Sequence, residues 1–528
     1  MIHSFDQLFG EIEYSIRKFS GIRNFTGLYS AQKRALMKVL LKVKESETVT
    51  GILQMPTGSG KTLLVAALML AVYRDELLKS KLLKRFGLER GVILLFLTPR
   101  SVLRQQTYDR VKKIVEGSLH IPVNILEPMG GDRLGYISQL RSATGVVITT
   151  PQMIGSILRR RKERRMLFEQ VFSPCIIVLD EAHVYYVGEK MKRLIDYLKR
   201  RSKAKLVLGL TATPTCESIK LLGDIVFRYS SLEAMAEGVL IPRLRVVRYS
   251  TLIEDLKPEC ASDERDGWKF AVYERAERYA EKIVEEAVEL GKTAGRLPKL
   301  LIVSVNTTEA DLISRYLHEH IERCGLPFTV FKAHYREPDA RGLIEEFKHS
   351  ADPAILITVN MADIGFDDPD LDMLVIARPL RSPVAYVQVR GRVLRRPISE
   401  DSVKKKLGYA VIIDLTGEAV KHEKREVIER VEGGIYGEEE FRNAERELRG
   451  EGEVVKAHAK IQVSSRSEFI VSPTVDAEIS FNPDDTVSIT FYVNRREKLR
   501  IAGIRLSSDL KDNLVSQARS HGLIINVA

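Results

Sequence analysis

The strongest structural signal in this sequence is Pro56-Thr57-Gly58-Ser59-Gly60-Lys61-Thr62. An apolar run ends near Gln54, just before the stretch, and an apolar helical pattern follows it. Glycines let the backbone N–H groups of such a loop converge on phosphate oxygens, and the helix adds the positive end of its dipole. The stretch therefore predicts a phosphate-binding loop between a buried strand and a helix. This chain has Met55 where the general pattern has its first glycine, so the strict form fails at one position.

A second motif supplies the acidic half of the same expected site. Asp180-Glu181-Ala182-His183 follows the apolar run Ile176–Leu179, which is typical of a strand buried on both faces. Open α/β sheets bind ligands at the carboxyl ends of their strands. We therefore expect Asp180 to hold Mg²⁺ and Glu181 to orient and deprotonate the attacking water. A solvated turn is the alternative for two adjacent carboxylates, and the apolar run before them disfavours it.

The phosphate loop completes the predicted ATP site. Lys61 is expected to reach the β- and γ-phosphates, and the Thr62 hydroxyl is expected to ligate Mg²⁺. The other loop residues expected to bind ATP are Thr57, Gly58, Ser59 and Gly60. A Gly-Lys-Thr triplet alone is weak evidence. Here the strand before it, the helix after it and the matching acidic motif support one another.

The composition is that of a large globular protein. At 528 residues the chain is too long for one hydrophobic core, so about three domains are expected. The hydrophobic fraction is 44%, and no apolar run reaches the roughly 18–20 residues needed to cross a bilayer. No signal peptide is visible at the N-terminus. The four cysteines lack CxxC spacing, which disfavours a zinc site and a disulfide framework. We expect a cytoplasmic protein that does not contact a membrane.

The charge balance points to a polyanionic partner. The chain has 82 Lys and Arg against 71 Asp and Glu, a formal net charge of +11. A basic surplus of this kind favours nucleic acid as the partner. The alternative is the highly charged surface of a thermophilic protein.

The alternation of short apolar runs with helical patterns predicts an α/β fold with two tandem parallel-sheet domains plus a small α+β C-terminal domain. The expected divisions are an N-terminal helix (1–24), a first domain (25–238), a second domain (239–420) with a helical insertion at about 244–299, a charged helical linker (421–450) and an accessory domain (451–528). The expected strands are Thr48–Leu53, Val92–Leu97, Val146–Thr149, Ile176–Leu179, Leu206–Leu208, Leu301–Val305, Ala354–Thr358, Met373–Ile376 and Ala410–Ile413.

Two local patterns outside the ATP motifs make further predictions. The insertion has an apolar stripe at helical spacing, and Gly291 is the expected end of that helix. The stripe consists of Val272, Ala276, Tyr279, Ile283, Ala287 and Leu290. Near the C-terminus, alternating apolar residues flank Asn482-Pro483-Asp484-Asp485, which predicts a β-hairpin. A helix over about 507–521 and a closing strand over Leu523–Val527 are expected after it.

In order along the chain, these motifs resemble those of superfamily-two helicases, specifically the branch with an Asp-Glu-Ala-His box that ends at His183. The resemblance covers roughly residues 25–418 and implies two RecA-like domains. It also implies that Gln32 reads adenine. The stretch from Gln388 to Arg395 matches the family's sixth motif, which implies catalytic functions for Gln388, Arg392 and Arg395. The two arginines would stabilise charge on the γ-phosphate. A surface basic cluster is the alternative for Gly391-Arg392-x-x-Arg395.

The same resemblance implies where nucleic acid binds. The segments implied to grip its backbone are Thr98-Pro99-Arg100, Gly130-Gly131 and Thr150-Pro151-Gln152, together with His334 and Thr358 in the second domain. Thr358, Gly365 and Asp367 match the family's fifth motif, which touches both nucleic acid and nucleotide. Thr211-Ala212-Thr213 matches the motif that links hydrolysis to movement. Such contacts go to sugar and phosphate, so sequence-specific reading is not expected. The basic run 159–165 either lies beside this path or is a solvated helix face.

A narrower likeness involves restriction enzymes. The segments 357–367 and 377–383 resemble the motor subunits of type I and type III restriction enzymes and their relatives in nucleotide-excision repair. Those relatives act mostly on double-stranded DNA, so the resemblance favours DNA over RNA. A nuclease is not expected, because Pro483-Asp484 falls in the predicted hairpin turn and Glu497-Lys498 lacks the spacer residue of a nuclease motif.

Three functions follow as alternatives. The first is an ATP- and Mg²⁺-dependent helicase or translocase on nucleic acid. The second is the motor subunit of a restriction or defence complex. The third is an ATP-gated clamp or remodeller that does not unwind its substrate and whose C-terminal domain binds a protein partner.

Overall fold

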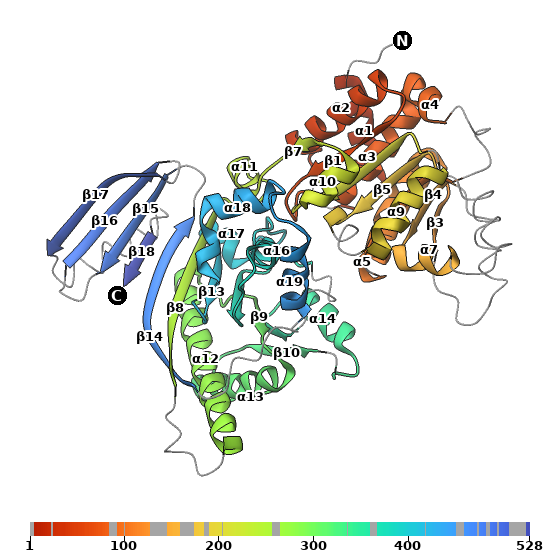
Figure 1. Cartoon of the computed structure of the whole chain (residues 1–528). Coiled ribbons are helices and arrows are strands. Elements are labelled where there is room, and N and C mark those ends of the chain that lie inside the picture. The colour runs from red at the N-terminus through yellow and green to blue at the C-terminus, as the bar shows by residue number, and fades with distance from the viewer. Residues whose placement is uncertain are drawn as a thin grey trace. The chain divides into compact units, whose positions relative to one another are not determined.

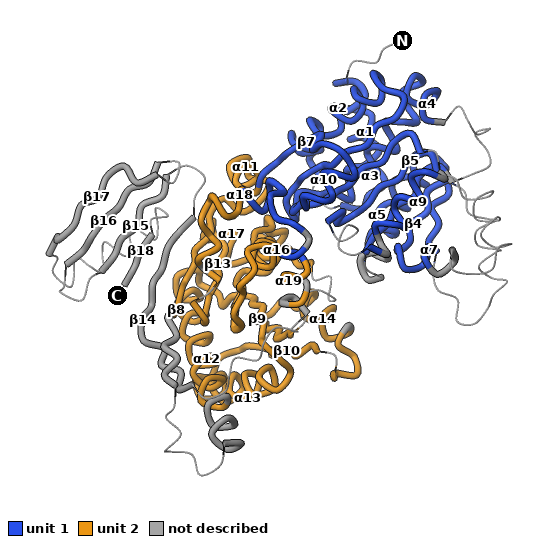
Figure 2. Tube along the Cα trace, in the orientation of Figure 1, with its two compact units in different colours: residues 1–230, 430–441 blue, residues 231–429, 442–528 orange. Residues whose placement is uncertain are grey.

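The computed structural model describes residues 5–22, 25–83, 92–99, 101–126, 145–158, 174–183, 189–202, 204–255, 264–334, 336–359, 367–417, 419–449, 459–471, 475–481, 486–493, 496–505 and 524–527. The chain forms two compact units (Figure 2). The first unit comprises residues 1–230 and 430–441, and the second comprises residues 231–429 and 442–528. The short segment 430–441, which interrupts the second unit in sequence, therefore belongs to the first unit.

The first unit is built on a parallel sheet of seven strands in the order β3-β4-β2-β5-β6-β1-β7. Its elements (Figure 1) are α1 (Phe5–Phe19), α2 (Ser30–Glu45), β1 (Val49–Gln54), α3 (Lys61–Arg74), α4 (Glu76–Leu83), β2 (Val92–Leu97), α5 (Ser101–Leu119), β3 (Val123–Ile125), β4 (Gly145–Thr149), α7 (Pro151–Leu158), β5 (Ile176–Asp180), α9 (Glu189–Ser202), β6 (Leu206–Thr211), α10 (Cys216–Leu222) and β7 (Ile225–Arg228). The central strands β5 and β6 are buried along their whole length, as expected for a parallel sheet covered on both faces.

The second unit repeats this design in its first six strands, which are parallel in the order β10-β11-β9-β12-β13-β8. Its elements are α11 (Ser231–Ala236), β8 (Arg243–Asp255), α12 (Glu264–Ala294), β9 (Leu300–Ser304), α13 (Thr307–Cys324), β10 (Thr329–Ala333), α14 (Ala340–His349), β11 (Ala354–Thr358), β12 (Met373–Ala377), α16 (Pro383–Val393), α17 (Val403–Leu407), β13 (Tyr409–Asp414) and the 3₁₀ helix η3 (Val420–Glu423). The expected fold class, two tandem parallel sheets with covering helices, is confirmed.

The chain then continues through α18 (Arg425–Glu432) and α19 (Glu438–Arg449), so the expected helical character of residues 421–450 is confirmed. The last strands are β14 (Ala459–Val471), β15 (Val475–Phe481), β16 (Thr486–Val493), β17 (Arg496–Arg505) and β18 (Ile524–Val527). They extend the second sheet, because β14 pairs antiparallel with β8. The predicted hairpin is confirmed by the antiparallel pairing of β15 with β16, in which Phe481 faces Val487. The helix expected over 507–521 lies outside the described residues.

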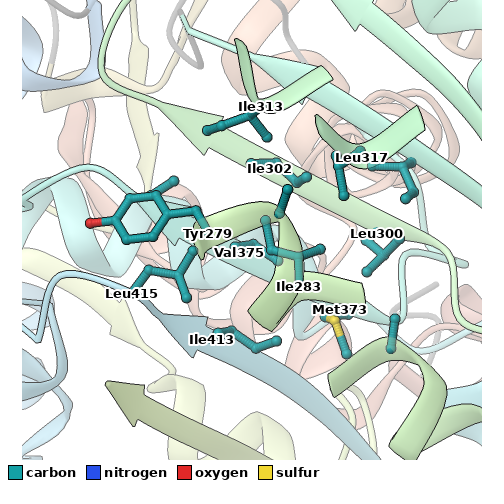
Figure 3. Packing of buried hydrophobic residues seen from close by; sticks show 14 of the residues in the cluster. Tyr279, Ile283, Leu300, Ile302, Ile313, Leu317, Met373, Val375, Ile413 and Leu415 are labelled. Atoms are coloured by element: carbon teal, nitrogen blue, oxygen red, sulfur yellow. The ribbon is translucent and has the colours of Figure 1, made fainter. Parts of the chain in front are cut away.

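The core of the second unit joins the predicted insertion helix to the sheet. Tyr279 and Ile283 of α12 pack with strand residues such as Ile302 and Val375 (Figure 3). The helices α12 and α13 lie side by side against this sheet (Figure 1). The apolar stripe of the insertion is buried from Ala276 to Leu290. Burial of this stripe is the packing reason for the helix.

The prediction that Gly291 ends the insertion helix is wrong, because α12 continues to Ala294. A Cβ on Gly291 would lie 2.7 Å from Leu297 Cδ2. The glycine is therefore explained by close packing against the chain that follows the helix. Gly295, with φ of +71°, has the left-handed conformation that terminates helices.

Among the described residues, no helix combines the length and apolar character of a membrane-spanning segment.

Candidate ATP site and nucleic-acid surface

The phosphate loop connects β1 to the start of α3. Gly58 and Gly60 have φ of 87° and 78°, the left-handed region that favours glycine, and Gly60 leads directly into the first turn of α3. The Ser59 hydroxyl donates to the Pro56 carbonyl at 2.7 Å and closes the loop on itself. Met55, at the position of the pattern's first glycine, is fully buried. The departure from the phosphate-loop pattern therefore falls at a position where the Met55 side chain packs in the interior.

Lys61 lies at the mouth of this loop. Its Nζ donates to the carbonyls of Met55 and Pro56 at 3.3 and 3.4 Å. The side chain is therefore folded over the loop, and Lys61 and Thr62 are both partly exposed at the N-terminus of α3. A helix N-terminus with a flexible ammonium beside it is suited to binding phosphate.

Gln32 contacts the phosphate loop directly. Its Nε2 donates to the carbonyls of Ser59 and Gly60 at 3.0 and 3.3 Å, and its Oε1 accepts from the Tyr29 N–H at 2.9 Å. The side chain is 1% exposed. A Cβ on Gly60 would lie 2.4 Å from Gln32 Nε2, so only glycine allows this contact. In this arrangement the Gln32 side chain is hydrogen-bonded to the phosphate loop. The recognition of adenine by Gln32 stays a prediction.

The acidic motif lies at the carboxyl end of β5, as the sequence predicts for this strand. Asp180 is the last residue of the strand, and its side chain is 9% exposed. Glu181 has φ of 49°, a left-handed backbone that is uncommon for a residue with a side chain. Strained conformations of this kind concentrate at functional sites. The turn places two carboxylates in succession at the ligand-binding edge of the sheet.

His183 links the acidic motif to the end of β6. Its Nδ1 lies 2.8 Å from Thr211 Oγ1 and 3.6 Å from Glu181 Oε2. Thr211 Oγ1 also accepts from the Thr213 N–H at 3.0 Å. All three members of Thr211-Ala212-Thr213 are buried. The predicted coupling motif and the predicted catalytic motif are therefore joined by the His183–Thr211 hydrogen bond within the first unit.

The segments predicted to grip nucleic acid are described in part. Thr98 is buried at the end of β2, and its N–H donates to the Thr149 carbonyl at 3.0 Å. Thr150 caps α7 by accepting from the Met153 N–H at 3.3 Å. Pro99 is partly exposed, Pro151 is buried and Gln152 is exposed. Arg100, Gly130, Gly131 and the basic run 159–165 lie outside the described residues. The geometry brings Thr98 and Thr150 to adjacent strand ends, β2 and β4.

The sixth motif is carried by α16 of the second unit. Ser382 caps this helix by accepting from the Ala385 N–H at 3.4 Å, and Pro383 occupies its first turn. Gln388 and Arg392 are partly exposed one turn apart, and Arg395 is partly exposed just beyond the helix. Arg395 pairs with Asp367, which the sequence also placed in the site. Gly365 lies outside the described residues.

Arg390, between the predicted catalytic side chains, is used differently. It is 1% exposed, and its Nε donates to both oxygens of Glu423 at 3.0 and 2.8 Å. The Tyr386 hydroxyl donates to the same carboxylate at 2.6 Å. Burial, followed by the adjacent Glu423 charge, raises the pKa of Tyr386 well above its usual range. This buried cluster anchors α16 to η3. Of this cluster, only Arg390 stands out in the sequence, because Glu423 lies among many other charged residues.

We predict that Arg390→Met lowers the free energy of unfolding of the second unit by about 3–5 kcal/mol, because it leaves a buried carboxylate without its cation. The double variant Arg390→Met/Glu423→Leu is expected to be more stable than the single one. Chemical denaturation of both variants measures this, with the exposed Arg396→Ala as the control. A single variant as stable as the wild type would contradict the assignment.

A buried lysine lies beneath the end of the same helix. Lys404 is fully buried, and its Nζ donates to the Val393 carbonyl at 3.2 Å. Burial lowers the pKa of Lys404 from 10.5 to about 8, and the nearby Asp372 carboxylate opposes this shift. The Lys404 N–H also donates to Asp372 Oδ1 at 2.9 Å. The last turn of α16 therefore rests on an ammonium that loses its charge in mildly alkaline solution.

The lowered pKa predicts a pH dependence of stability. Below about pH 8, Lys404 is protonated in both the folded and the unfolded chain, so the full cost of burying the charge is present. Between pH 8 and 10.5 the folded chain releases this proton first, and the wild type is expected to gain roughly 3 kcal/mol relative to Lys404→Met. Denaturation of both proteins across this window measures the difference. A constant difference would show that the pKa of Lys404 is not lowered.

His334 lies in a cluster of charges in the second unit. It is 6% exposed, and its Nε2 lies 3.1 Å from Asp311 Oδ1 and 3.5 Å from Glu337 Oε1. The Lys332 ammonium bridges the same two carboxylates at 2.7 and 3.1 Å. Lys332 therefore supplies the positive charge that a metal ion would supply to these ligands. Contact of His334 with nucleic acid stays a prediction and would require this cluster to open. Thr358, the other predicted contact, is buried at the end of β11.

These features define a class. A phosphate loop and an acidic box at the strand ends of one parallel sheet, followed by a second parallel sheet with an arginine-bearing helix, characterise a helicase-type nucleotide motor. Comparison with known families agrees. Residues 26–216 match the family described as "Type III restriction enzyme, res subunit", and residues 281–397 match the "Helicase conserved C-terminal domain". The resemblance to superfamily-two helicases is confirmed, because the two matched families fall on the two parallel-sheet regions.

Individual relatives are distant. The chain is 22% identical over 412 residues to the type I restriction enzyme EcoKI endonuclease subunit of Escherichia coli, covering 69% of this chain and 32% of the relative. It is 23% identical over 458 residues to the ATP-dependent DNA helicase RecG of Aquifex aeolicus, covering 81% and 46%. The chain thus spans less than half of either relative. Among solved structures, Mss116p bound to single-stranded RNA and AMP-PNP has a similar fold, with a TM-score of 0.52, 17% identity and coverage of 82% and 78%.

Proposed function

We propose that this chain is an ATP-dependent nucleic-acid motor that acts on DNA. The observation that carries the proposal is the arrangement of the acidic box at the end of β5, in which His183 is hydrogen-bonded to Thr211 and lies 3.6 Å from the Glu181 carboxylate. Matches to the restriction-subunit and helicase families support the same reading. In this proposal residues 25–238 and 239–420 are the two motor domains, and residues 451–528 are an accessory domain.

The chemistry follows from the side chains at the strand ends. Lys61 would exchange its loop carbonyls for the β- and γ-phosphates of ATP, and Glu181 would orient the attacking water and take its proton. The oxygen ligands of Thr62 and Asp180 suit Mg²⁺, which would neutralise phosphate charge when bound. Arg392 and Arg395 would stabilise the charge that develops on the transferring phosphoryl group. Because these arginines belong to the second unit, hydrolysis would require both units to take part.

We propose DNA as the polymer because the chain matches a restriction-enzyme subunit family and is similar to a relative described as a DNA helicase. The net charge of +11 is consistent with binding a polyanion. Binding would go to sugar and phosphate, so affinity is expected to fall steeply with salt and little with sequence. A second candidate, the motor subunit of a restriction complex, is favoured by the match over residues 26–216. It would require separate nuclease and specificity subunits as protein partners.

Two displacement assays test the motor. In the first, the protein displaces a third strand from a DNA triplex, which reports translocation along duplex. In the second, it separates a forked duplex, which reports unwinding. ATP-dependent activity in either assay, abolished in Lys61→Ala, supports the motor. ATP-dependent binding with no displacement in both would contradict it and favour a clamp. Activity only after addition of co-purified subunits would favour the restriction complex.

A further inference from the structure

The short segment 430–441, which lies between β13 and β14 in sequence, belongs to the first unit and contacts α10. The Cys216 N–H donates to the Tyr436 carbonyl at 3.1 Å. The Cys216 thiol donates to the carbonyls of Gly434 and Ile435 at 3.1 and 3.0 Å. Cys216 begins α10, three positions after Thr213 of the coupling motif. One end of this segment is therefore fixed beside the coupling motif.

Gly434 makes this anchor possible. Its φ is +75°, and a Cβ at this position would lie 2.5 Å from Ile219 Cδ1 and 3.1 Å from Pro214 Cγ. The backbone thus approaches the Pro214 loop and α10 more closely than any residue with a side chain allows. A segment packed this closely is held at a defined position in the first unit.

The other end of the segment reaches the acidic motif. Phe441, in the first turn of α19, is 3% exposed, and its ring centroid lies 5.4 Å from that of His183 at an interplanar angle of 46°. This centroid distance falls within the range of about 4.5–7 Å at which aromatic rings interact. The same imidazole is hydrogen-bonded to Thr211 and lies 3.6 Å from Glu181. Phe441 therefore contacts the side chain that joins the predicted general base to the coupling motif.

We infer that Phe441 is a positioning residue for ATP hydrolysis. Its ring holds the His183 imidazole in the orientation in which Nδ1 contacts Thr211 Oγ1 and lies near the Glu181 carboxylate. The inference rests on the proposed function, and it assigns part of the ATP site to a residue 258 positions after His183. Without the ring, the space beside His183 lets the imidazole turn away from Thr211. Small misplacements of catalytic groups have large effects on rate.

The segment also has a connection to the sixth motif. Glu423, eighteen positions before Phe441, holds Arg390 of α16 in the second unit. The chain between these two residues is thus fixed at one end to the arginine-bearing helix and at the other end to the acidic box.

The test is steady-state ATP hydrolysis by the full chain with saturating duplex DNA. Phe441→Leu, which keeps most of the apolar volume, is expected to lower kcat about tenfold with KM for ATP within twofold of the wild type. Phe441→Tyr, which keeps the ring, is expected to retain most of the activity. Asn443→Ala, an exposed change on the same helix, is the matched control and should leave kcat unchanged.

A mutant cycle separates positioning from general packing. In a His183→Ala background, Phe441→Leu is expected to have no further effect on kcat, because its effect passes through His183. Equal fold-losses in both backgrounds would overturn the inference. In addition, the imidazole proton signals of His183, assigned with His183→Gln, should shift in Phe441→Leu because the adjacent ring current is lost.

Different results would overturn the inference about Phe441 and the proposed function. An active wild type whose Phe441→Leu variant keeps its kcat overturns this inference alone. A wild type that hydrolyses no ATP with any polymer overturns the proposed function and the inference with it.

Discussion

Lys61→Ala is expected to lower the rate of ATP hydrolysis by about a hundredfold to a thousandfold at every nucleic-acid concentration. The reason is that Lys61 is the cation at the N-terminus of α3, where its Nζ donates to two loop carbonyls within 3.4 Å and is predicted to bind the phosphates of ATP. Removing a preorganised charge donor at a site of developing charge has an effect of that size. Steady-state release of phosphate from ATP measures it.

The control for this prediction is Lys42→Ala, which changes an exposed lysine on α2 of the same unit. It should hydrolyse ATP at the wild-type rate and unfold at the same temperature as Lys61→Ala. If Lys61→Ala retained more than a tenth of the activity, the phosphate loop would not be the catalytic nucleotide site.

The second large effect is expected at the sixth motif. Arg392→Ala and Arg395→Ala should each lower kcat by about a thousandfold while changing the affinity for ATP far less, because arginine fingers act mainly on the transition state. Both side chains are partly exposed on α16 or just beyond it, whereas Arg390 is buried. Burial therefore distinguishes the two arginines that we predict to be catalytic from one anchoring arginine within six residues.

Arg396→Ala is the matched control for this pair, since Arg396 is exposed and adjacent in sequence. Its kcat should equal that of the wild type. Binding of a fluorescent ATP analogue distinguishes a loss of catalysis from a loss of binding. A parallel loss of affinity and rate in Arg392→Ala would place this side chain in ground-state binding and contradict its assignment as a finger.

Strands buried on both faces were predictable from the sequence, because runs such as Ile176–Leu179 have no polar residue to interrupt them. The strands β3, β7, β8, β10, β14 and β17 were not predicted, and β8 occupies residues 243–255, where the start of a helical insertion was expected. β3 has three residues, β7 has four and lies at the edge of its sheet, and β10 is largely unburied and includes Lys332. Short edge strands have little burial to mark them in the sequence. The error at Gly291 is of another kind. This glycine was expected to end a helix, whereas its close packing against Leu297 explains it.

The ATP site was predictable to the extent that its chemistry is local. The loop from Pro56 to Thr62 and the Asp180-Glu181 pair each have a strand before them, which a sequence pattern reveals. Contacts between distant segments were not predictable. Gln32 on the loop carbonyls, Arg390 with Glu423, and Phe441 against His183 each join residues separated by at least 27 positions. Only the folded chain brings them together.

The most direct test of the central claim is the rate of ATP hydrolysis with no polymer, with single-stranded DNA, with duplex DNA and with RNA, in parallel for the wild type and Lys61→Ala. A nucleic-acid motor on DNA predicts strong stimulation by DNA, the stronger with duplex, and none in the variant. The same low rate with all four additions would contradict a motor that works alone. Stimulation by RNA only would contradict the assignment to DNA.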